Sequence, residues 1–121
     1  MYVNEGRLQA AIVRAIKKQY PTAWVFHPVG GPYQETGVPD LVICADGWFV
    51  GIEIKNPRPG ESQESITSRV TPGQRAQIRA INRAGGTAGV ATSVEEALDL
   101  LARAEREREE RDGHDGHTDL R

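Results

Sequence analysis

The chain has 121 residues, of which 38% are hydrophobic and 26% are charged. These values are typical of one folded domain and exclude a disordered chain. No apolar run approaches the ~20 residues that a membrane-spanning helix needs, and the N-terminus lacks a signal-peptide pattern. The net charge of −2 excludes a uniformly basic nucleic-acid binder, so phosphate contacts would have to come from a local basic cluster. A cytoplasmic protein is predicted.

The single cysteine, Cys44, is also consistent with a reducing, cytoplasmic compartment. It lies in an apolar, strand-like run, which predicts a buried and reduced side chain. One cysteine also excludes an internal disulfide or a thiolate metal site within one chain.

The first elements are predicted to be a helix at residues 5–19 and a strand at 23–27. Asn4 is a suitable N-cap for the helix, and apolar residues follow it at helical spacing: Leu8, Ala11, Ile12, Ala15 and Ile16. Glu5 lies in the first turn, where a carboxylate compensates the helix dipole. His27 ends the strand, where it either approaches a functional site or has a local partner.

Two more strands are predicted at residues 41–45 and 48–55, joined by a tight turn. Side chains alternate between the faces of a strand. One face of the second strand therefore carries only apolar residues, namely Trp48, Val50, Ile52 and Ile54. Glu53 and Lys55 lie on the other face. If the strands form a hairpin, Asp40 lies at the same open end as Glu53 and Lys55.

Two carboxylates and a lysine at one point have a chemical use. Asp40 and Glu53 offer the hard oxygen ligands that suit Mg²⁺. Lys55 could then position or deprotonate a water that attacks a phosphodiester. The simpler alternative is an ordinary surface salt bridge between Glu53 and Lys55.

The segment after the hairpin is predicted to be a mobile loop at residues 56–70, followed by a helix that begins at Pro72 with Thr71 as N-cap. In the loop, Arg58 and Arg69 are candidates for substrate contact. On the helix, Gln74 heads an inward-facing apolar row and needs a partner. Three arginines spaced by four form a basic stripe that could bind phosphates: Arg75, Arg79 and Arg83.

The chain ends in a predicted strand at 87–92, parallel to its neighbour, and a helix that starts with a Ser93–Glu96 capping box. From Arg103 onward there are 5 Arg and 7 Asp or Glu, so the other 102 residues carry 10 basic and 10 acidic groups. We expect residues 1–104 to form the domain and 105–121 a charged, flexible tail, which starts as an all-polar extension of the helix and frays from His114. The tail histidines His114 and His117 lack a scaffold for metal binding.

The motifs resemble a known family. Pro39-Asp40 followed by Glu53-Ile54-Lys55 looks like the PD-(D/E)XK nuclease signature. Gly37 precedes this signature, and the helix start Thr71-Pro72-Gly73-Gln74 follows it. Together these residues look like the VRR-NUC branch of the family, and the resemblance extends from Glu5 to about Leu101. The resemblance implies an α/β fold with a mixed central sheet flanked by helices.

The resemblance also implies roles for individual residues. Asp40, Glu53 and the carbonyl of Ile54 would hold Mg²⁺, which Mn²⁺ could replace, and Glu5 could reach the ion through a water. Lys55 and Gln74 would complete the catalytic group, while the candidates for DNA binding are Arg58, Arg75 and Arg79.

These features predict a structure-specific DNA endonuclease, similar to Holliday-junction resolvases, that acts as a homodimer. The apolar Trp48 strand face, with Trp24, would supply the dimer interface unless helices of the same chain cover it. The alternative function is a nucleic-acid-binding module that keeps the nuclease fold without cutting.

Overall fold

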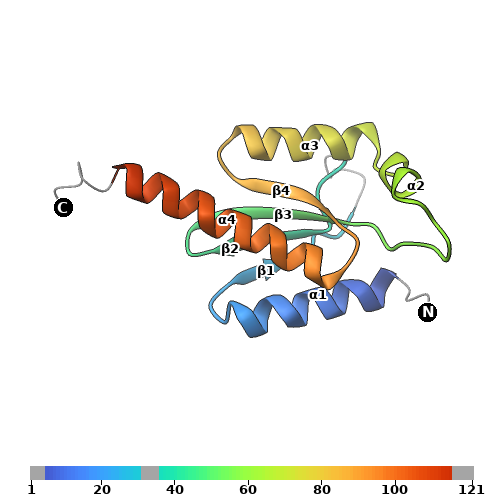
Figure 1. Cartoon of the computed structure of the whole chain (residues 1–121), viewed down its shortest axis with the longest axis horizontal. Coiled ribbons are helices and arrows are strands. Elements are labelled where there is room, and N and C mark those ends of the chain that lie inside the picture. Colours follow the sequence, from blue (N-terminus) through green and yellow to red (C-terminus); the bar gives the residue numbers. More distant parts are fainter. Residues whose placement is uncertain (1–4, 31–35, 116–121) are drawn as a thin grey trace.

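The structure is a computed structural model that describes residues 5–30 and 36–115. Its elements follow one another in the order α1 (Glu5–Gln19), β1 (Trp24–Phe26), β2 (Leu41–Ala45), β3 (Trp48–Ile54), α2 (Gln63–Ser68), α3 (Pro72–Arg83), β4 (Thr87–Ala91) and α4 (Val94–Asp115). Figure 1 shows α4 running across one face of the sheet, with α1 along the β1 edge and α3 along the β4 edge. Within the described ranges, no helix is long and apolar enough to cross a membrane.

The four strands form one mixed sheet in the order β1-β2-β3-β4. β1 and β2 pair antiparallel, as do β2 and β3, while β4 runs parallel to β3. The β2–β3 hairpin turns at Asp46 and Gly47, which both have positive φ, the conformation of the tight turns that match strand twist. The predicted hairpin and the parallel fourth strand are both confirmed.

The core lies on the sheet face that carries Trp48, Val50, Ile52 and Ile54, all at most 6% exposed. Apolar side chains of α1 and α4 cover this face, among them Ile12, Ile16 and Leu101. On β4, Gly89 lets α4 approach, because a Cβ there would lie 2.9 Å from a Leu100 methyl. The Trp48 face is therefore not the dimer interface that the sequence suggested, since helices of the same chain bury it.

The opposite face of the sheet is only partly covered, by α3 over β3 and β4. Gly51 allows this contact, because a Cβ at that position would lie 3.1 Å from the side chains of Ile81 and Pro39. Over β1 and β2 the described residues leave the same face open, with Trp24 and Phe26 exposed. Cys44 is consequently exposed, and the prediction that it is buried is wrong: an apolar run does not reveal which of its faces is covered.

One further difference concerns the helices. The predicted loop at residues 56–70 contains α2, which begins at the N-cap Ser62 and buries Ile66. A helix of 6 residues is too short to show a clear apolar period, which explains why the sequence did not reveal it.

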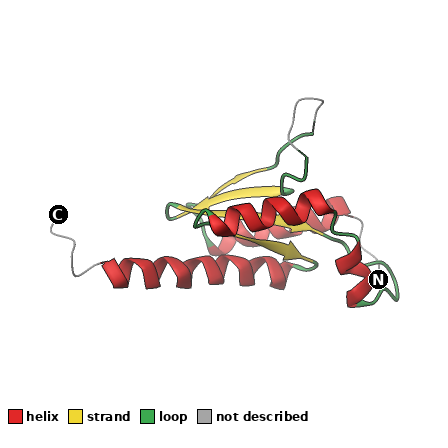
Figure 2. Cartoon of the chain, turned by 90° about the horizontal axis from the view of Figure 1, so that it is seen from above, coloured by secondary structure: helices red, strands yellow, loops and turns green. Residues whose placement is uncertain are grey.

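The last helix continues without a break through Ala104 to Asp115, so the all-polar helix extension that the sequence predicted beyond Ala104 is present. The guanidinium of Arg111 lies 4.3 Å from the ring centroid of Trp48 and donates to the Gly85 carbonyl, while Arg108 lies 3.8 Å from the Asp46 carboxylate. These contacts hold the helix against the sheet, and its last turns extend beyond the strands (Figure 2).

Candidate active site

Two carboxylates meet at the open end of the β2–β3 hairpin. Leu41 pairs with Ile52, so the next step of the antiparallel register places Asp40 opposite Glu53. Oδ2 of Asp40 accepts a 2.8 Å hydrogen bond from the main-chain N–H of Ile54. The N–H and C=O of one residue in a strand point to the same side, so the Ile54 carbonyl faces the Asp40 side of β3.

Glu53 is a buried carboxylate, only 3% exposed. Its Oε2 accepts a 2.8 Å hydrogen bond from Nε2 of Gln74 and lies 3.5 Å from Nζ of Lys55. Its Oε1 is also buried but has no hydrogen-bond partner among the described residues. A buried carboxylate oxygen without a partner is costly, so this atom indicates a place where a cation or a proton belongs.

The protonation behaviour of Glu53 agrees with this geometry. Burial, followed by the negative charge of Asp40, raises the pKa of Glu53 from 4.5 to about 7, although the ammonium of Lys55 acts in the opposite direction. Desolvation and a neighbouring like charge both disfavour the ionised carboxyl. A bound cation would relieve both effects at once.

Gln74 connects the carboxylates to the start of α3. Its main-chain N–H donates to Oγ1 of Thr71, and its Oε1 accepts from the Thr71 N–H, which completes a capping box. The amide nitrogen is then left to donate to Glu53. The sequence indicated that Gln74 needs a partner, and the capping geometry explains how its side chain is held in place.

Gly37 brings the loop before Asp40 against the same helix end. Its φ is +84°, and a Cβ at this position would lie 2.4 Å from the carbonyl of Gly73 and 2.7 Å from the N of Gln74. Only glycine tolerates both the backbone conformation and this close approach. In the sequence Gly37 is recognisable only as part of a motif, and the contact with Gly73 is a feature of the folded chain.

The donor set fits a small divalent cation that keeps several waters. Asp40, Glu53 and the Ile54 carbonyl are hard oxygen donors, as Mg²⁺ prefers. Within the part of the chain that the structure describes, no group of three or more His, Cys, Asp or Glu residues could hold a metal, so water would supply the other ligands. The side chain of Glu5, the fourth predicted ligand, lies outside the described residues.

Comparison with known proteins supports the same architecture. A solved structure described as a VRR_NUC domain protein superposes with a TM-score of 0.63 and 18% identity, covering 88% of this chain and 92% of that one. A second solved structure, described as a VRR_NUC domain, superposes with a TM-score of 0.52 and 16% identity, covering 77% of this chain and 92% of that one. The chain has the fold of a VRR-NUC domain. The predicted PD-(D/E)XK-type α/β fold is therefore confirmed.

The likeness was found in structure alone. No family model matches the sequence, and no curated protein matches it. At 18% identity and below, the comparison establishes the VRR-NUC fold, whereas any activity has to be argued from the side chains themselves.

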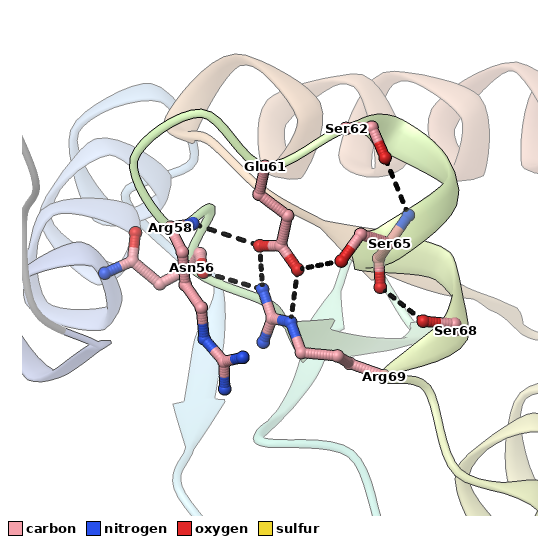
Figure 3. Close-up of polar contacts among 7 residues, drawn as sticks. All are labelled: Asn56, Arg58, Glu61, Ser62, Ser65, Ser68 and Arg69. Atoms are coloured by element: carbon pink, nitrogen blue, oxygen red, sulfur yellow. Dashed lines mark hydrogen bonds and ion pairs between the residues drawn. The ribbon is translucent and has the colours of Figure 1, made fainter.

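The segment after Lys55 is held by a polar network around Glu61. The carboxylate of Glu61, which is 5% exposed, accepts from the guanidinium of Arg69, the N–H of Arg58 and the hydroxyl of Ser65. These bonds, above all those from Arg69, lower the pKa of Glu61 to about 2. Figure 3 shows the network, with the side chain of Arg58 pointing away from Glu61.

Arg69 also donates a 2.8 Å hydrogen bond to the carbonyl of Asn56, the residue that follows Lys55. It therefore links α2 to the end of β3, where the sequence predicted a substrate contact in a mobile loop. The exposed side chain of Arg58 stays a candidate for phosphate binding.

Two other predicted basic residues, Arg75 and Arg79, lie on α3. Arg75 donates to the carbonyls of Thr67 and Val70, which connects α3 to α2. Arg75 and Arg79 line a pocket of about 310 Å³ whose described lining includes neither Asp40 nor Glu53. A role for this pair in DNA binding stays a prediction.

His27 has a local partner, which is one of the two alternatives that its place at a strand end predicted. Its Nδ1 lies 2.9 Å from Nε2 of Gln9 in α1. The hydrogen bond joins the end of β1 to the first helix.

Proposed function

We propose that this chain is a metal-dependent endonuclease of the VRR-NUC family that hydrolyses phosphodiester bonds in DNA. The observation that carries the proposal is the environment of Glu53. A buried carboxylate faces Asp40; one of its oxygens has no partner in the described part of the chain, while Lys55 and Gln74 contact the other. A structural salt bridge would not require the second carboxylate or the unpartnered oxygen.

Each side chain has a role that follows from its position. Asp40, Glu53 and the Ile54 carbonyl would hold Mg²⁺, or Mn²⁺ in its place. The ion would supply Lewis-acid polarisation of the phosphate and a more acidic water. Gln74 holds the Glu53 carboxylate at 2.8 Å and so restricts its rotation. Lys55, 14% exposed, is close enough to solvent to orient the attacking water or take its proton.

The substrate that we propose is branched DNA. A domain of this size has little surface for reading base sequence, so recognition through DNA shape and phosphate contacts is favoured. Resolving a four-way junction needs two incisions and therefore a symmetric dimer. Because α1 and α4 bury the Trp48 face, such a dimer would have to form through another surface.

Nicking of a supercoiled plasmid in Mg²⁺ tests the proposal. Asp40→Asn and Glu53→Gln should reduce nicking by at least about a thousandfold, because each removes a ligand charge while creating no cavity. Asp46→Asn is the matched control: this carboxylate lies at the other end of the same hairpin and is 73% exposed, so nicking should be unchanged. Lys55→Ala should lose nicking yet still bind DNA in Ca²⁺.

The same variants separate the metal site from the activity. Mg²⁺ should raise the melting temperature of the wild-type protein and not that of Asp40→Asn, since a ligand that binds only the folded state stabilises it. Normal nicking by Asp40→Asn would refute the assignment. Binding of branched DNA without any metal-dependent nicking by the wild type would identify a non-catalytic nucleic-acid-binding module instead.

A further inference from the structure

The open part of the sheet carries an aromatic pair that the candidate active site does not use. Trp24 is 56% exposed and Phe26 is 49% exposed. Their rings are nearly parallel, with an interplanar angle of 6° and centroids 5.5 Å apart. Large aromatic side chains are normally buried, and a contiguous exposed apolar patch commonly marks a binding surface.

The aromatic pair lies on the same sheet face as the carboxylates and near them. Phe26 pairs with Val42, which is two residues from Asp40 on β2. With 3.3 Å per residue along a strand and 4.8 Å between strands, the Cα atoms of Phe26 and Asp40 lie roughly 8 Å apart. That distance is about two nucleotide steps of 3.4 Å along a DNA strand. A strand that reaches the carboxylates can therefore also pass over Phe26.

Charge favours a nucleic acid over a second copy of the chain on this surface. α1 lies along the β1 edge (Figure 1) and carries three exposed cations in its second half, Arg14, Lys17 and Lys18. A twofold interface at this edge would bring two such sets of like charge together. A polyanion is complementary to them. Unpaired bases, in addition, can stack on aromatic faces whatever their sequence.

We propose that Trp24 and Phe26 stack against one or two unpaired bases next to the phosphate that is cut. The substrate class would then be DNA with a single-stranded segment at the cleavage point, such as an overhang, flap or splayed duplex. This inference deepens the proposed nuclease function and rests on it for the position of the cut, whereas the binding step can be measured without cleavage.

Tryptophan fluorescence in EDTA tests the binding step with the full chain. A short oligothymidine should quench Trp24. Trp48 serves as an internal reference, because it is buried and its Nε1 donates to Thr87. Trp24→Leu should abolish the quenching. By anisotropy with a labelled overhang, Phe26→Leu should weaken binding by about 5- to 150-fold, the range expected for one lost stacking contact.

The control is Val29→Ala, which trims an exposed side chain that has no ring and should leave affinity unchanged. Thiol labelling gives an independent measurement, because the exposed Cys44 pairs with Trp24 across β1 and β2. Bound oligothymidine should slow the labelling of Cys44. Unchanged affinity in Phe26→Leu, or equal quenching by blunt duplex, would overturn the proposal. The proposal would also be overturned if light scattering showed a wild-type dimer that Trp24→Ala converts to monomers.

Failure of this inference can be told from failure of the nuclease proposal. Quenching by single strands without any metal-dependent cleavage would leave the stacking surface standing and refute the nuclease. Cleavage of overhang and blunt duplex at equal rates, unaffected by Phe26→Leu, would support the nuclease and refute the stacking surface.

Discussion

The raised pKa of Glu53 makes a quantitative prediction about folding stability in metal-free buffer. Between pH 4.5 and about 7 the folded protein keeps a proton on Glu53 that the unfolded chain has lost. Stability falls with rising pH wherever the folded state binds more protons. The contribution of Glu53 is therefore complete below pH 4.5 and is lost as the pH rises through 7.

The size of this effect follows from the two pKa values. The rise from 4.5 to about 7 is about 2.5 pH units, which at 1.36 kcal/mol per unit corresponds to about 3 kcal/mol. For a domain of this length, that free energy corresponds to a change in melting temperature of about 10 °C. The carboxyl of Glu61 has its pKa lowered to about 2, so its contribution is lost below pH 4.5 and does not overlap this window.

Urea unfolding of the wild type and of Glu53→Gln, measured from pH 4.5 to 8.5 in EDTA, checks the prediction. The variant has no proton to lose at residue 53. From pH 4.5 to 8.5 its free energy of unfolding should therefore rise by about 3 kcal/mol relative to that of the wild type. Mg²⁺ at pH 8 should remove most of the difference by stabilising the wild type. Parallel stability curves for the two proteins would refute the electrostatic account of Glu53.

Two other predictions concern the supports of the site. Gly37→Ala should cost at least about 2 kcal/mol in urea unfolding, because it adds strain at positive φ to a clash with the main chain of Gly73. Gly47→Ala is the control, because Gly47 also has a positive φ of +79° but has nothing within 4 Å of the new Cβ. It should lower the free energy of unfolding by only about 1 kcal/mol. An equal loss of stability in both variants would contradict the close approach of Gly37 to Gly73. Arg69→Met should speed amide hydrogen exchange in residues 57–68 with little change in global stability, because it releases α2 from the Asn56 carbonyl. Unchanged exchange would show that α2 is held by its apolar contacts alone.

Much of the secondary structure could be predicted from local pattern. The apolar spacing of α1, the period of two in β3 and the Thr71-Pro72 start of α3 are properties of short segments, and the structure reproduces them. The positions of Asp40, Glu53 and Lys55 at one hairpin end follow from the same alternation, because the tight turn determines the register. For these elements, neighbours in the sequence carry the information.

The sequence by itself therefore determined the hairpin, the helices with clear periods and the residue types at the candidate site. Only the tertiary structure decided which surfaces are covered. Helices α1 and α4 bury the Trp48 face, whereas the face of Trp24 and Cys44 stays open. In β1 and β2 both faces are apolar in sequence, so pattern alone cannot tell them apart. The burial of Glu53, and with it the raised pKa, likewise depends on α3 packing over β3, a contact between segments about twenty residues apart.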